Sequence, residues 1–133
     1  MTRYLLDTNI VSDMLRRPEG PAAKRFSRVG QHNIGISIIV AGELRYGALR
    51  RGTAELVRMV SEALERLSIL PFEDPADVYY AEVRAGLEKA GTPIGRNDTL
   101  IAAHALALGC TLVTDNEREF ARVKSLKVEN WLR

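Results

Sequence analysis

The sequence has little cysteine, little histidine and no long apolar segment, and each shortage excludes a class of protein. Its single cysteine, Cys110, cannot form an internal disulfide, which predicts a reducing compartment and a small buried side chain. The two histidines, His32 and His104, form no zinc signature, and we expect His104 to pack within an apolar helix. No apolar run approaches the roughly 20 residues that cross a bilayer, and we see no signal-peptide pattern. We therefore expect a cytoplasmic protein with no membrane partner.

Charge of one sign is not in excess either. The chain has 19 Lys and Arg residues against 17 Asp and Glu residues, a net charge of +2 that does not by itself require a nucleic-acid partner. Basic residues cluster in two stretches, residues 16–28 and 43–51. Such clusters are typical of solvated helix faces, and equally of a phosphate-attracting rim around an acidic centre. Composition does not decide between these two interpretations.

The length of 133 residues predicts a single domain, residues 1–133, with a substantial core. Short apolar segments alternate with helical patterns along the whole chain. The expected strands are residues 3–7, 34–39, 68–72, 111–114 and 127–131, the third of them near a sheet edge because it contains a proline. The expected helices are residues 10–17, a short one from Pro21, and residues 40–52, 54–67, 75–90 and 98–108.

Strands that are apolar throughout and separated by helices predict an α/β fold, with a mainly parallel sheet covered by helices on both faces. If the first three strands run outward and the fourth returns beside the first, the order becomes 3-2-1-4-5. In such a doubly wound sheet, ligands bind beyond the carboxyl ends of the strands where the order reverses. We therefore expect the functional site between the first and fourth strands.

Four acidic residues converge on that expected position. Asp7 and Asp115 end the first and fourth strands, Glu43 follows the second, and Asp98 starts the helix that leads into the fourth. At an effective dielectric constant near 20, two carboxylates ~5 Å apart repel each other by about 3 kcal/mol. A divalent cation removes that repulsion, and Mg²⁺ or Mn²⁺ prefers oxygen ligands of this kind. The pattern thus predicts a metal site that is suited to phosphate chemistry.

Several residues in this region have structural interpretations beside the functional ones. Glu43 is expected within the first turn or so of a helix, where the helix dipole alone favours an acid. Asn9 and Asn116 follow two of the acids and could donate to carboxylates or substrate, or cap the following helices. Glu119 lies four residues after Asp115 and could join the cluster, but we expect it to be exposed to solvent.

Taken together, these motifs resemble the PIN-domain ribonucleases, and more closely the VapC toxins of bacterial toxin–antitoxin pairs. The stretches that carry the resemblance are RYLLDTNI, ISIIVAGELRYG, PIGRNDTLIAAHA and LVTDNEREFARVKSLKVENW, which together reach from residue 3 to residue 131. The resemblance implies an endoribonuclease that depends on Mg²⁺ or Mn²⁺. It also implies a homodimer, a small VapB-type antitoxin whose tail covers the active site, and transfer RNA as the substrate.

Residue by residue, the resemblance assigns metal coordination to Asp7, Asp98 and Asp115, with Glu43 assisting directly or through water. Ser37 is kept, whereas Val40 stands where many relatives have a hydroxyl side chain, which puts a helix cap or a substrate contact in doubt. The candidates for phosphate contact are Arg45, Arg50, Arg51 and Arg96.

Two other functions compete with the nuclease. A PIN-fold RNA- or protein-binding module without catalysis would be expected to have lost one of the acids, and none is lost here. A phosphatase or phosphoacceptor domain also gathers aspartates at strand ends. However, Asn9 stands where a haloacid-dehalogenase-type enzyme has its second aspartate. Lys124 and Lys127 are poor matches for the lysine of a receiver domain.

Overall fold

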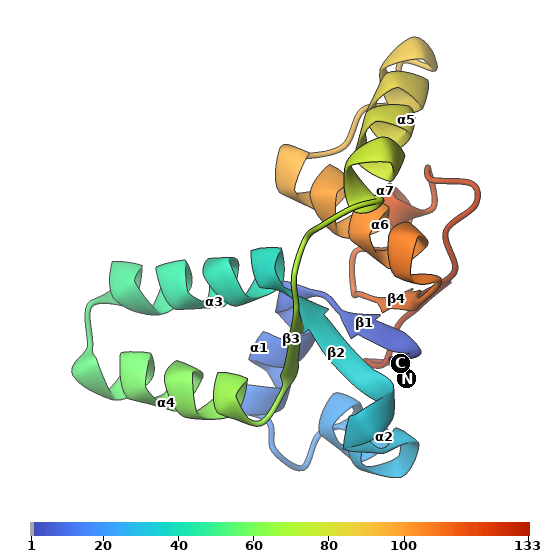
Figure 1. The fold of residues 1–133 in the computed structure, drawn as a ribbon. Coiled ribbons are helices and arrows are strands. Elements are labelled where there is room, and N and C mark those ends of the chain that lie inside the picture. The colour runs from blue at the N-terminus through green and yellow to red at the C-terminus, as the bar shows by residue number, and fades with distance from the viewer. Residues whose placement is uncertain (1) are drawn as a thin grey trace.

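The computed structural model describes residues 2–133 and contains a five-stranded sheet in the order β3-β2-β1-β4-β5 (Figure 1). Every neighbouring pair of strands is parallel. The strands are β1 (Tyr4–Leu6), β2 (Ile34–Ser37), β3 (Ser68–Leu70), β4 (Thr111–Val113) and β5 (Val128–Glu129). The predicted α/β fold and strand order are confirmed, and β3 lies at a sheet edge as its proline indicated.

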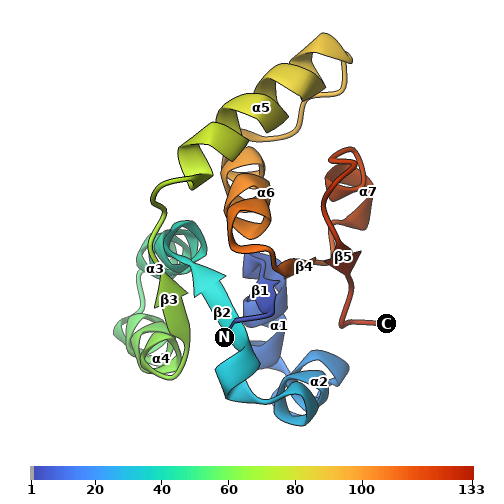
Figure 2. The same ribbon diagram turned by 45° about the vertical axis from the view of Figure 1, so that its right-hand side comes forward.

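Helices connect the strands and cover both sides of the sheet. They are α1 (Thr8–Arg16), α2 (Pro21–Val29), the 3₁₀ helix η1 (Gln31–Asn33), α3 (Ile38–Arg51), α4 (Ala54–Glu65), α5 (Ala76–Lys89), α6 (Arg96–Leu108) and α7 (Glu117–Phe120). Helix α6, with α5 packed on it, lies on one side of the sheet, and α1 and α2 lie on the other (Figure 2). Helices α3 and α4 pair into an arm that extends away from the sheet (Figure 1).

The end of β2 differs from the prediction, and the difference matters for the site. Residues 38 and 39, expected in the strand, instead begin α3, because the Ser37 hydroxyl oxygen accepts a hydrogen bond from the Ile39 N–H at 3.1 Å and caps the helix. Ser37 therefore supplies the cap that Val40 cannot. Glu43 consequently lies in the second turn of α3, so the expected stabilisation by the helix dipole in the first turn was wrong.

The core joins the sheet to α6. The side chain of His104 is buried there, and its Nδ1 lies 2.8 Å from Ser37 Oγ. Burial lowers the pKa of His104, so the neutral ring can accept the hydroxyl proton of Ser37. The predictions that His104 and Cys110 are packed side chains are both confirmed. Among the described residues, no helix combines the length and apolar character needed to cross a membrane.

Candidate active site

Asp7 stands at the carboxyl end of the central strand and forms the floor of the site. Its carboxylate is buried, accepts from the Thr8 N–H at 2.8 Å, and thereby caps α1. The other oxygen accepts from Thr114 Oγ1, also at 2.8 Å, across the gap between β1 and β4. Burial raises the pKa of Asp7, the bonds from Thr114 and Thr8 oppose that rise, and the nearby Glu43 adds to it.

Glu43 joins three helices above this floor. One carboxylate oxygen accepts from Thr8 Oγ1 at 2.7 Å, and the other accepts from Asn97 Nδ2 at 3.2 Å. Thr8 begins α1, Glu43 lies on α3 and Asn97 is in the first turn of α6, so both oxygens are held from different directions. The predicted convergence of Glu43 on Asp7 is therefore present, with a fixed side-chain orientation.

Asp98 lies in the first turn of α6, and its carboxyl group is paired with that of Glu119. Burial raises the pKa of Asp98 to about 7, with further contributions from a hydrogen bond to Glu119 and from the negative charges of Asp7, Glu119 and Glu43. The raised pKa of Asp98 favours its protonated form, which can donate a hydrogen bond to the Glu119 carboxyl group.

Glu119 is the residue that sequence reasoning placed wrongly. It lies on the short helix α7, is partly buried, and accepts from Asn116 Nδ2 at 2.7 Å as well as from Asp98. The expectation of solvent exposure is therefore wrong, and the rejected alternative, that Glu119 joins the cluster, is correct. Its only signal in the sequence was the four-residue spacing from Asp115, one helical turn.

The structure does not bring the carboxylate of Asp115 to the other acids. This side chain is exposed and accepts from Asn130 Nδ2 at 3.0 Å, while its N–H donates to Asn9 Oδ1 at 3.1 Å. The physical reason is the alternation of side chains along an extended chain. Thr114 takes the inward position that faces Asp7, which leaves Asp115 facing outward.

The predicted asparagines and arginines are placed as follows. Asn9 lies inside α1 and does not cap it, because Asp7 does. Asn9 Nδ2 instead donates to Asp7 Oδ2 at 3.4 Å. Asn116 stands at the cap position of α7 but donates its side chain to Glu119, so neither side chain caps a helix and the alternative, donation to carboxylates, is present for both. Arg45 donates to Ser61 on α4 at 3.3 Å, away from the acids. Arg96 begins α6 and lines a separate hollow beside the acidic residues.

A cleft of about 350 Å³ connects these groups, and we call it the acidic cleft. Its lining residues are Asp7, Thr8, Asn9, Ser12, Arg16, Glu43, Asp98 and Asn116. Within residues 2–133, no Lys or Arg side chain forms an ion pair with Asp7, Glu43, Asp98 or Glu119. Arg16 reaches the wall but lies nearest to Asp13, at 3.9 Å. The cleft therefore gathers negative charge without a paired cation.

The donor set fits a hard divalent cation. Carboxylate oxygens are the ligands that Mg²⁺ and Mn²⁺ prefer, and the raised pKa of Asp98 reflects repulsion that such an ion would relieve. Across the described part of the chain, no three His, Cys, Asp or Glu side chains already meet in the arrangement of a metal site. The side chains therefore fit a metal ion by their ligand chemistry and their charge, without a preformed coordination geometry. Asp98 would have to release its proton and turn its carboxylate toward the ion.

Comparison with known proteins agrees with this architecture. The family model described as PIN domain matches residues 4–126. Ribonuclease VapC2 of Haemophilus influenzae is 38% identical over 99% of this chain and 100% of its own. The tRNA(fMet)-specific endonuclease VapC of Shigella flexneri is 34% identical over 98% of this chain and 99% of its own. A solved structure of VapBC2 from Rickettsia felis, bound to a promoter DNA fragment, matches with a TM-score of 0.89 and 37% identity, covering 98% of this chain and 99% of that chain.

Proposed function

This chain belongs to the PIN-domain family, and from that premise we propose that it is a metal-dependent endoribonuclease, the toxin of a VapBC-type toxin–antitoxin pair. The observation that carries the proposal is the convergence of Asp7, Glu43 and Asp98 in one cleft, beyond the carboxyl end of the central strand β1. They come from distant parts of the sequence, and no ion pair within residues 2–133 neutralises them. Local folding alone does not account for such a costly arrangement.

The metal is proposed to be Mg²⁺ or Mn²⁺, held by Asp7, Asp98 and Glu119. Glu119 replaces Asp115 in this set because its carboxyl group is the one that touches Asp98. Such an ion, when bound, neutralises charge on a phosphodiester and lowers the pKa of a coordinated water. The protein supplies the fixed ligand positions that this chemistry requires.

The surrounding hydrogen bonds define what each side chain contributes. Hydrogen bonds from Thr114 and the Thr8 N–H favour the ionised form of Asp7 and oppose the rise in its pKa that burial causes. Thr8 Oγ1 and Asn97 fix both oxygens of Glu43, which is thereby positioned to orient the water that attacks phosphorus. Asn116 holds Glu119 against the end of α6.

The proposed substrate is RNA, and transfer RNA is the first candidate because one relative is named for tRNA(fMet). The proposed partner is a VapB-type antitoxin, since several structural relatives are VapBC complexes. A groove of about 290 Å³ between α1, α3 and α4 is largely apolar apart from four lining residues that it shares with the acidic cleft: Thr8, Ser12, Arg16 and Glu43. An antitoxin tail in this groove would end against the catalytic acids.

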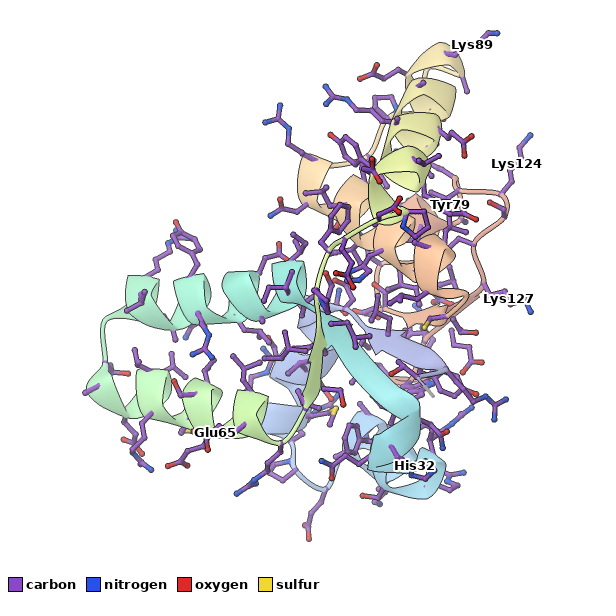
Figure 3. The ribbon with its side chains drawn as sticks, in the orientation of Figure 1. His32, Glu65, Tyr79, Lys89, Lys124 and Lys127 are labelled. Carbon is purple, nitrogen blue, oxygen red and sulfur yellow. The ribbon has the colours of Figure 1, made fainter. Side chains whose placement is uncertain are left out.

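A homodimer is also part of the proposal. Large apolar side chains are exposed on two of the helices: Ile38, Tyr46 and Leu49 on α3, and Val78 and Tyr79 on α5. Such an exposed apolar set is typical of a protein interface. The phosphoacceptor alternative has less support, because within residues 2–133 neither Lys124 nor Lys127 forms an ion pair with an acid of the site. Both lie on the opposite side of the molecule from the α3–α4 arm (Figure 3).

The test is cleavage of tRNA(fMet) and of total RNA by the purified chain, with Mg²⁺, with Mn²⁺ and with EDTA. We expect discrete cuts that EDTA abolishes and that Asp7→Asn reduces by at least about a thousandfold. Glu65→Gln is the matched control, since it removes a charge at the end of α4, away from the cleft (Figure 3). RNA binding without any cutting by the wild-type protein would instead favour the silent binding module.

A further inference from the structure

Beside the acidic cleft lies a second, basic hollow of about 210 Å³. Tyr80 and Arg84 of α5 form one wall, Arg96 and Thr99 of α6 form the other, and Ile94 closes the end. We call it the arginine hollow. Two of its five lining side chains are guanidinium groups and none is acidic. It is smaller than the ~300–1,000 Å³ of a typical drug-sized ligand site, so it suits one charged group.

Arg84 is held in place before any ligand arrives. Its Nη1 donates to the Tyr80 hydroxyl at 2.9 Å, and its Nε donates to Glu88 Oε2 at 3.1 Å. The guanidinium also lies over the Tyr80 ring, 6.0 Å from the ring centroid. These contacts, which include an ion pair with Glu88, restrict the guanidinium and reduce the entropy lost when it binds an anion; among the described residues its Nη2 donates no hydrogen bond.

Arg96 provides the second positive charge and the connection to the acids. Within residues 2–133 it forms no ion pair with a carboxylate, so its charge is not neutralised. Arg96 and Asp98 are two residues apart in the first turn of α6, so their Cα atoms are at most about 7.6 Å apart. Asn97, between them, already reaches Glu43. The first turn of α6 therefore lies between the acidic cleft and the arginine hollow. In Figure 1 this turn is found between α3 and α5.

A nuclease whose cleft gathers carboxylates must attract a polyanion by charges placed outside that cleft. Arginine is suited to this because its planar fork matches two phosphate oxygens. We propose that the arginine hollow binds a phosphate of the RNA strand next to the scissile phosphate, with Arg84 and Arg96 as its contacts. Tyr80 acts as a positioning residue that holds Arg84. This inference rests on the proposed function, since it assigns a subsite for the same substrate.

The test measures RNA binding and cleavage separately. Binding of fluorescein-labelled tRNA(fMet) is followed by anisotropy in proteins that carry Asp7→Asn, and cleavage is followed with Asp7 intact. The variants are Arg84→Gln and Arg96→Gln. Arg58→Gln is the matched control, because Arg58 forms the equivalent pair with Glu62 on α4, at 3.1 Å, outside both sites. Circular dichroism verifies that all variants fold.

We expect Arg84→Gln and Arg96→Gln each to weaken binding and to lower kcat/KM by about 5- to 10-fold, with kcat little changed. Each should also reduce the slope of log Kd against log salt concentration by about one. Tyr80→Phe, which keeps the ring but loses the hydroxyl, should produce a smaller loss in the same direction. Arg58→Gln should stay within about twofold of the parent in both assays.

The inference is overturned if Arg84→Gln and Arg96→Gln behave as Arg58→Gln does. It is also overturned if they weaken binding of an acidic protein partner while RNA binding is kept. Failure of the proposed function looks different, because the wild-type protein then cuts no RNA. In that case the binding measurements still decide whether the arginine hollow is an RNA site.

Discussion

The carboxyl groups of Asp98 and Glu119 are hydrogen-bonded to each other, which joins the first turn of α6 to α7. Burial raises the pKa of Asp98 to about 7, and the contact with Glu119 and the negative charges of Asp7, Glu119 and Glu43 add to that rise. This pairing identifies which acid completes the set begun by Asp7 and Glu43. It also separates Glu119 from Asp115, whose carboxylate turns to Asn130.

The first prediction compares these two acids by substitution. Glu119→Gln should lower kcat/KM for RNA cleavage by about 10- to 100-fold, because it removes a ligand charge beside Asp98. Asp115→Asn should lower it by less than about fivefold, since its side chain is exposed and bonded to Asn130 rather than to Asp98. Both variants are assayed at saturating Mg²⁺. A larger loss in Asp115→Asn than in Glu119→Gln would contradict this assignment.

The second prediction concerns the support of Asp7. Thr114→Val removes the hydrogen bond at 2.8 Å that lowers the pKa of Asp7, so that pKa should rise further. Since metal binding needs the ionised carboxylate, the acidic limb of the pH–rate profile should move to higher pH. We expect the loss of activity relative to the wild-type protein to be larger at pH 6 than at pH 8. Thr114→Ser, which keeps the hydroxyl, should restore the profile; an unshifted profile in Thr114→Val would exclude this role.

Sequence patterns were sufficient for the sheet and for three of the acids. Strands that are apolar throughout indicated a parallel sheet, and the order 3-2-1-4-5 then placed Asp7 at the point where the order reverses. It placed Asp115 there too, which the side-chain positions contradict, while Asp98 was expected nearby at the start of the helix that leads into the fourth strand. Glu43 followed because it comes shortly after the second strand. These inferences depend on patterns several residues long, which tolerate small errors in the ends of each element.

The remaining parts of the site depend on single-residue boundaries. Whether Thr114 or Asp115 faces Asp7 is decided by one step of side-chain alternation, and a shift of one residue reverses it. The start of α3 likewise depends on whether Ser37 caps the helix or continues the strand. The inward orientation of Glu119 depends on its contacts with Asp98 and Asn116. Asp98 is far from Glu119 in the sequence, and no periodic pattern predicts either contact.

The third prediction is a pH dependence of stability in metal-free protein. The pKa of Asp98 is about 7 in the folded state against 3.8 for an ordinary aspartate, so the folded state binds the proton more tightly. The free energy of unfolding should therefore fall as pH rises from about 4 to about 7. Allowing for solvent screening of this partly exposed group, we expect a change on the order of 1–2 kcal/mol.

Asp98→Asn should flatten that dependence and make the metal-free protein more stable at pH 8, as is common when a strained active-site charge is removed. Mg²⁺ should raise the Tm of the wild-type protein at pH 8 and have little effect on Asp98→Asn. Thermal unfolding in EDTA and in Mg²⁺ measures both effects, with Asp115→Asn as the control. A wild-type Tm in EDTA that rises between pH 5 and pH 8 would contradict the predicted loss of stability on ionisation of Asp98.

The fourth prediction concerns Ser37, which links the start of α3 to α6. Its hydroxyl accepts from the Ile39 N–H at 3.1 Å and lies 2.8 Å from Nδ1 of the buried His104. Ser37→Ala would remove a helix cap and also leave a buried ring nitrogen without this partner. A lost cap costs about 1 kcal/mol, and an unsatisfied buried group costs a further ~1–3 kcal/mol.

Thr53→Ala is the matched control, because Thr53 caps α4 through a bond of 3.2 Å to the Leu56 N–H at an exposed position. We expect a loss of about 0.5–1 kcal/mol in Thr53→Ala and about 2 kcal/mol or more in Ser37→Ala, measured by urea unfolding. Because α3 carries Glu43, Ser37→Ala should also lower kcat at temperatures where it remains folded. Equal losses of stability in the two variants would show that the bond between Ser37 and His104 contributes no net stability. The α3–α6 connection would then depend on apolar packing alone.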